Sequence, residues 1–172
     1  MPHHLIHPGY LNFLDKYGPQ LMSGMPSDRL AAAEALRAEG GLDAFDATMF
    51  RTARPGEELL YELAVADCGA ALYLVSDGVG VASPPHEHRT GAVIVGLRGI
   101  ETHTRYERTS VDQRTVTVQA GCSVGPGELL AMGPTEIHST IVLGNEASFH
   151  LHAYGIALDR LPLFATRCFR VG

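Results

Sequence analysis

Apolar residues recur at helical spacing in the first third of the chain. One such stretch covers residues 8–17, and the pair Gly18-Pro19 directly after it predicts the end of a helix. A second stretch covers residues 28–39, with Ser27 as a candidate N-cap and Gly40-Gly41 as the stop signal. We therefore expect a mainly helical N-terminal segment that packs on the outside of the main domain.

After residue 57 the pattern changes to short runs of alternating apolar and polar residues, separated by turns rich in glycine and proline. Eight strands in so short a stretch indicate a closed barrel or jelly roll. We expect one domain over residues 1–172, all-β with N-terminal helices, whose barrel occupies residues 58–172. The predicted strands are Leu59–Val65, Ala70–Ser76, Ala92–Leu97, Glu101–Glu107, Arg114–Ala120, Glu128–Met132, Ile137–Leu143 and Ala147–Tyr154.

Composition narrows the class of protein. The 172 residues are 45% hydrophobic and 19% charged, as in an ordinary globular protein, and the net charge of −6 argues against a nucleic-acid partner. No apolar run is long enough to cross a bilayer, so no membrane partner is expected. Residues 1–7 lack the features of a secretion signal, and we expect a cytoplasmic location.

Histidine is the unusual residue type, because six of the nine histidines lie between positions 86 and 152. Side chains two apart on a strand share a face, so His86 and His88 can converge on one ion. Their context is specific. Gly80-Val-Ala-Ser-Pro-Pro-His-Glu-His88, followed by Gly99, resembles the first motif of the cupin superfamily.

The second cupin motif has its counterpart between Gly127 and His138, with the proline shifted by one place and Val142 where an asparagine is usual. This resemblance implies a double-stranded β-helix, the cupin or jelly-roll barrel. It also implies that opposite strands supply His86, His88 and His138 as metal ligands. A metal-free cupin with structural histidines is the alternative.

Ala92 stands where most metal cupins have a glutamate ligand. The expected metal site is therefore three neutral imidazoles without a carboxylate, with open positions for anionic ligands and dioxygen. The commoner ferrous site of oxygenases has two histidines and one carboxylate. Cupins with three histidines resemble the thiol dioxygenases, and the β-diketone dioxygenases form a second such group.

The last predicted strand favours the first of these groups. Ser148-Phe-His-Leu-His-Ala-Tyr154 places His150, His152 and Tyr154 on one face. The segment resembles the Ser-x-His-x-Tyr of cysteine dioxygenase-like thiol dioxygenases of the bacterial type, with His150 in place of the serine. The resemblance implies that Tyr154 reaches the iron site, that His152 orients it, and that His150 lies just behind them.

Two positions depart from that family. A cysteine that is joined covalently to the tyrosine in the mammalian members corresponds to Ala92, so no such cross-link can form. The carboxylate-binding arginine corresponds to Leu63. Arg51, Arg54 and Arg89 are open alternatives for that role.

The sequence thus predicts a non-haem iron(II) thiol dioxygenase that converts a small aliphatic thiol, such as cysteine or 3-mercaptopropionate, to its sulfinate with O2. Fe(2+) is the expected cofactor, and the thiol and O2 are the expected partners. Two alternatives remain open: a three-histidine dioxygenase that cleaves a β-diketone or another carbon compound, and a non-catalytic cupin that binds a ligand. The sequence leaves the oligomeric state open.

Overall fold

The computed structural model describes residues 8–39, 47–109 and 114–172. Two helices, α1 (Pro8–Leu21) and α2 (Pro26–Glu39), precede the strands, and short 3-10 turns follow at η1 (Ala47–Met49), η2 (Leu158–Arg160) and η3 (Phe164–Arg167). No helix within these ranges has the length and apolarity that a membrane span requires. The strands are β1 (Glu58–Val65), β2 (Ala71–Asp77), β3 (His86–Glu87), β4 (Ala92–Arg98), β5 (Glu101–Arg108), β6 (Thr115–Val124), β7 (Leu129–Met132), β8 (Ile137–Ile141), β9 (Ser148–Tyr154) and β10 (Arg170–Val171).

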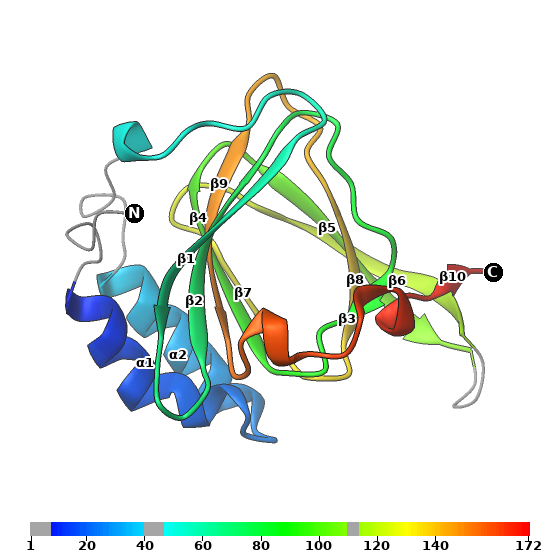
Figure 1. Cartoon of the computed structure of the whole chain (residues 1–172). Coiled ribbons are helices and arrows are strands. Elements are labelled where there is room, and N and C mark those ends of the chain that lie inside the picture. Colours follow the sequence, from blue (N-terminus) through cyan, green and yellow to red (C-terminus); the bar gives the residue numbers. More distant parts are fainter. Residues whose placement is uncertain (1–7, 40–46, 110–113) are drawn as a thin grey trace.

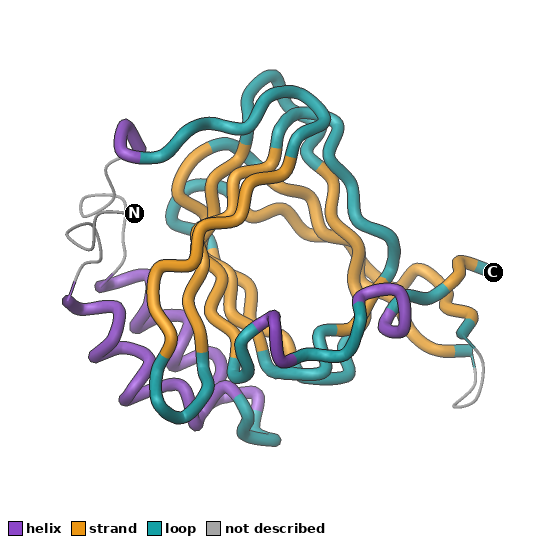
Figure 2. The backbone as a smooth tube through the Cα atoms, in the orientation of Figure 1, coloured by secondary structure: helices purple, strands orange, loops and turns teal. Residues whose placement is uncertain are grey.

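In the described part of the chain the strands form two five-stranded sheets that curve around a common axis (Figures 1 and 2). The first has the order β1-β2-β9-β4-β7, and the second has the order β10-β6-β5-β8-β3. Except for the parallel β10–β6 pair, neighbouring strands run antiparallel. Long crossovers such as that between β2 and β9 are those of a jelly roll, which confirms the predicted fold class.

All eight predicted strands are present, with ends displaced by a few residues. The predicted end of the fifth strand at Ala120 is wrong, because β6 continues to Val124 and Gly121 pairs with Thr104 of β5. Ladder hydrogen bonds to β5 outweigh the weak strand propensity of one glycine. Two strands were not predicted, β3 and β10, since two residues are too few to show an alternating pattern.

The predicted break at Gly18-Pro19 is also wrong, because α1 continues to Leu21. Leu21 is fully buried, as are Phe13 and Leu14 earlier in the helix, so the last turn of α1 is held by packing. Gly18 permits this approach, since a Cβ there would lie 2.7 Å from the Cβ of Ala70. Tertiary packing therefore overrides the local breaker signal.

Helix α2 begins at Pro26, and Ser27 is not its cap. Proline suits a first helical position, where its missing N–H leaves no bond unmade. The Ser23 hydroxyl accepts a hydrogen bond from the Met25 N–H and donates one of 2.5 Å to the Asp28 carboxylate. The expected stop at Gly40-Gly41 and the N-terminal residues 1–7 lie outside the described residues.

Both helices lie against the outer face of the first sheet (Figure 1). Side chains on β2, β4 and β9 alternate between this face and the barrel interior, as the period of a strand requires. The outward positions join the helices in the main apolar core, which includes Leu72, Leu74, Val93, Val95, Phe149 and Leu151. The inward positions are left to build the interior of the barrel, where the polar chemistry lies.

Replacing Phe13 with alanine tests how firmly the helix pair is joined to the sheet. Phe13 is fully buried in the main core, so Phe13→Ala should lower the free energy of unfolding by about 3–5 kcal/mol. Leu11, on the same helix, is 43% exposed, and Leu11→Ala should change it by less than about 1 kcal/mol. Urea unfolding followed by circular dichroism measures both. Equal effects of the two substitutions would contradict this packing.

Candidate metal centre

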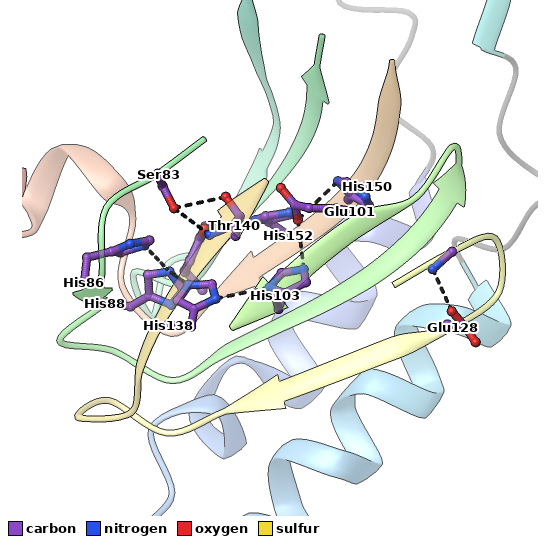
Figure 3. A network of polar contacts seen from close by, with 12 residues as sticks. Ser83, His86, His88, Glu101, His103, Glu128, His138, Thr140, His150 and His152 are labelled. Carbon is purple, nitrogen blue, oxygen red and sulfur yellow. Dashed lines mark hydrogen bonds and ion pairs between the residues drawn. The ribbon is translucent and has the colours of Figure 1, made fainter. Parts of the chain in front are cut away.

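Three imidazoles meet inside the barrel near one end of the second sheet (Figure 3). His86 and His138 are directly opposite each other in the β3–β8 ladder, and His88 follows two positions after His86. The Nε2 atom of His88 lies 3.2 Å from the Nε2 atoms of both His86 and His138. The structure thus brings the three predicted ligands together. It differs from the sequence analysis in one respect, because their strands are neighbours in one sheet and not opposite strands.

The geometry of this trio fits a metal ion. Two adjacent nitrogen ligands at about 2.0–2.1 Å from the metal are about 2.8–3.0 Å apart in an octahedral site and about 3.3–3.4 Å apart in a tetrahedral one, and the separations of 3.2 Å lie between these values. All three side chains are at most 6% exposed. One ring nitrogen of a neutral imidazole carries no proton, so His88 cannot satisfy two facing Nε2 atoms, and a cation would.

Burial keeps these imidazoles neutral. It lowers the pKa of His86 to about 4 and the pKa values of His88 and His138 well below the ordinary value of 6.5, and the neighbouring imidazoles lower them further. Imidazole binds a metal only as the neutral base. The trio is therefore in its metal-binding form at neutral pH.

Hydrogen bonds behind two of the ligands fix which nitrogen faces the centre. Nδ1 of His86 lies 2.9 Å from the carbonyl oxygen of Pro84 and donates to it, which leaves Nε2 free. Nδ1 of His138 lies 3.1 Å from Nδ1 of His103, and Nε2 of His103 lies 2.9 Å from a carboxylate oxygen of Glu101. When Nε2 of His138 faces the centre, its Nδ1–H donates to Nδ1 of His103, and the proton of His103 then lies on Nε2, the nitrogen nearest Glu101.

The trio opens into a pocket of about 360 Å³ between the sheets. Strand β9 contributes His152 and Tyr154 to its wall, because its alternate residues point inward while Phe149, Leu151 and Ala153 pack under the helices. Residues of η2 and η3 complete the wall, namely Leu158, Phe164 and Arg167.

The three residues predicted on β9 are buried and face the barrel interior, and two of them, His152 and Tyr154, line the pocket. Nδ1 of His152 lies 3.0 Å from the Tyr154 hydroxyl, and the Tyr154 ring packs edge-on against His88 with ring centres 5.2 Å apart. His150 lies deeper, beside Glu101. Their catalytic roles stay predictions, but Tyr154 stands next to a candidate ligand.

The positions that depart from the family pattern, Ala92 and Leu63, differ in their distance from the pocket. Ala92 is paired with Tyr154 across β4 and β9, so a side chain there would lie beside the tyrosine. Leu63 is buried in the helix-side core, on the far face of the sheet from the pocket. Arg51 pairs with Glu57 and Arg89 pairs with Glu87. Of the alternatives to Leu63, including Arg54, none lines the pocket.

Sequence reasoning missed Arg167, Glu101 and His103. Arg167 is 7% exposed and lines the pocket from η3, with Nη1 donating to the Glu87 carbonyl and Nε to the Pro162 carbonyl. No motif surrounds it, so the sequence carries no signal for it. Glu101 and His103 are two apart on a predicted strand, and that spacing could have placed both on the inner face.

Comparisons with known proteins address the fold. No protein-family model and no curated protein matches the chain. Among solved structures, a conserved protein of unknown function from Streptococcus pyogenes is 17% identical, with a TM-score of 0.51 over 66% of this chain and 86% of that chain. A cupin 2 conserved barrel domain protein from Leptotrichia buccalis is 14% identical, with a TM-score of 0.50 over 64% of this chain and 46% of that chain.

At these identities the likeness concerns the fold alone. The chain has the cupin fold, as predicted. Within it, the described residues include a group of three buried histidines suited to hold a metal ion.

The low pKa of His86 predicts a pH-dependent stability in the metal-free protein. Below about pH 6.5 the unfolded chain protonates this imidazole while the folded state does not until about pH 4, so acid favours unfolding over that window. Between about pH 7.5 and 5.5, wild type should lose about 1.4 kcal/mol of unfolding free energy relative to His86→Gln. Urea unfolding with a chelator present measures this. The relative change should vanish between about pH 7.5 and 8.5, and a parallel acid response of both proteins would contradict it.

Proposed function

We propose that this chain is a non-haem iron(II) thiol dioxygenase that oxidises a small aliphatic thiol carrying a carboxylate. The observation that carries the proposal is the position of Tyr154: its hydroxyl is held by His152 and its ring lies against His88, in the pocket onto which the histidine trio opens. A carbon-cleaving dioxygenase with three histidines has no need of this pair.

The trio His86, His88 and His138 would hold the iron. Bound there, iron(II) would supply open positions for a thiolate and dioxygen and would activate the oxygen. The overall reaction is RSH + O2 → RSO2H, in which sulfur loses four electrons, dioxygen gains four, and both oxygen atoms end on sulfur.

Tyr154 would act as a hydrogen-bond donor to the reacting atoms. Burial raises the pKa of its hydroxyl, and the negative charge of Glu101 raises it further, so the hydroxyl keeps its proton. Burial, together with His150, lowers the pKa of His152 to about 3, so this imidazole stays neutral and can bond the tyrosine without carrying a charge. A neutral, fixed donor is suited to charge that develops on oxygen.

Arg167 would bind the carboxylate of the substrate. Two of its N–H groups are used by main-chain carbonyls, which hold the guanidinium at the pocket wall with its remaining donors available. The parallel N–H groups of a guanidinium match the two oxygen atoms of a carboxylate. Arg167 therefore takes the role that the family resemblance assigns to the position of Leu63.

Removing the Tyr154 hydroxyl tests its proposed role as a hydrogen-bond donor to the reacting atoms. Tyr154→Phe should keep iron and fold but lower turnover roughly 10–100-fold, since only the donor is lost. Tyr106→Phe is the matched control, because Tyr106 bonds Ser139 and does not line the pocket. Oxygen uptake with cysteine, 3-mercaptopropionate and β-diketones is measured, with mass spectrometry for a product heavier by two oxygen atoms. Full activity of Tyr154→Phe, or uptake with diketones alone, would reject the proposal.

Arg167→Gln tests the proposed binding of the substrate carboxylate by Arg167. It should lower kcat/KM for 3-mercaptopropionate about 10–100-fold more than for 2-mercaptoethanol, which has no carboxylate to bind. The ratio of the two substrates cancels any general damage to the pocket. Arg160→Gln, at an exposed position on η2, should leave the ratio unchanged. Equal losses on both thiols would remove Arg167 from substrate binding.

A further inference from the structure

A second group of metal-ligating side chains lies inside the barrel, near the histidine trio. Glu101 on β5 faces His150 and His152, which are two apart on β9, across the space between the two sheets (Figure 3). One ligand atom from each of the three lies within 4.8 Å of the others. All three are nearly buried, at 2%, 0% and 8% exposure. Two histidines and one carboxylate are a ligand set for divalent transition metals.

The polar atoms of this group lack partners among the described residues. Both ring nitrogens of His150 and Nε2 of His152 are buried and make no hydrogen bond. Oε2 of Glu101 lies 2.9 Å from Nε2 of His103, but outside the geometry of a hydrogen bond. A polar atom that is left unpaired in a protein interior destabilises the fold, because it has lost its water without gaining a partner. One cation between the three side chains would give a partner to Oε2 of Glu101, to Nε2 of His152 and to one ring nitrogen of His150.

The surrounding charge points the same way. Asp77, paired with Ser148 across β2 and β9, is buried next to Glu101. Glu58 also lines the pocket, so three carboxylates, Glu58, Asp77 and Glu101, lie in its wall. Among the described residues that line the pocket, Arg167 is the only lysine or arginine. Its hydrogen bonds go to the Pro162 and Glu87 carbonyls, not to these carboxylates. A buried carboxylate needs a cation close by.

We propose that Glu101, His150 and His152 form a second metal site, separate from the histidine trio, for a divalent first-row transition ion. The site does not depend on the reaction proposed above. It bears on Tyr154, however, because a His152 that binds metal through Nε2 carries its proton on Nδ1. That proton is then donated to the Tyr154 oxygen, which leaves the tyrosine O–H free to point into the pocket.

Metal counting tests the proposal without any assay of activity. The full chain is stripped with a chelator, dialysed against a small excess of zinc and analysed for bound zinc. Wild type should hold about two ions per chain, His86→Ala about one, Glu101→Gln about one, and the double variant none. Glu146→Gln, at an exposed position, should equal wild type. Circular dichroism checks that each variant is folded.

His150→Ser provides a second variant should Glu101→Gln fail to fold, because it removes a ligand without adding bulk. It should also bind about one zinc ion. One ion in wild type, or an undiminished zinc content in Glu101→Gln or His150→Ser, would overturn the second site. Since His86→Ala disables only the trio, its remaining ion reports on the second site alone. Failure of this proposal is thereby distinguished from failure of the proposed dioxygenase.

Discussion

The antiparallel pairing of β3 with β8 is the contact on which the centre depends. It sets His86 opposite His138, and His88, one residue beyond the strand, places its Nε2 atom 3.2 Å from the Nε2 atoms of both. A strand of two residues has little stability of its own. On the side away from β8, β3 contacts the C-terminal segment: Cys168 forms a backbone β-bridge with His86, and the Phe169 N–H donates to the Pro85 carbonyl. The C-terminal segment therefore stabilises β3 in its place beside β8.

Burial then sets the chemistry of the interior. Burial lowers the pKa values of the imidazoles, which are therefore neutral at neutral pH. A buried carboxylate is stable in its charged form only where a positive group lies nearby. Glu87, fully buried, is paired with Arg89 and Arg108 on the outer side of its strand. The neighbours of Glu101 are the imidazoles of His103 and His150 and the carboxyl group of Asp77. The barrel is therefore electrostatically uneven, with a compensated end near Glu87 and an acidic end around Glu101.

The sequence predicts those parts of the site that are coded locally. His86 and His88 share a strand face, and His138 sits in a motif of fixed spacing, so the trio could be named without a structure. The alternation of β9 likewise put His150, His152 and Tyr154 on one face, although it could not show that only His152 and Tyr154 of these three line the pocket.

Features that depend on distant contacts escaped prediction. Helix α1 runs through Gly18-Pro19 because Leu21 is buried against the sheet, and β6 runs through Gly121 because its partner strand continues. Arg167 enters the pocket from a 3-10 turn that no periodic pattern marks. The position that the family resemblance gives to a carboxylate-binding arginine is Leu63 on β1, and this residue lies in the core on the helix side of the sheet.

The wall of the pocket is built from strands and from the turns after β9. The segments around β3, β8 and β9 carry its histidines, whereas Leu158, Phe164 and Arg167 belong to those turns. The turns are also joined to the ligand strand, because Arg167 donates to the Glu87 carbonyl and Cys168 forms a β-bridge with His86. An evolving lineage can therefore vary the molecules it accepts more freely at Leu158 than at Arg167, where a change would also disturb the strand that carries His86.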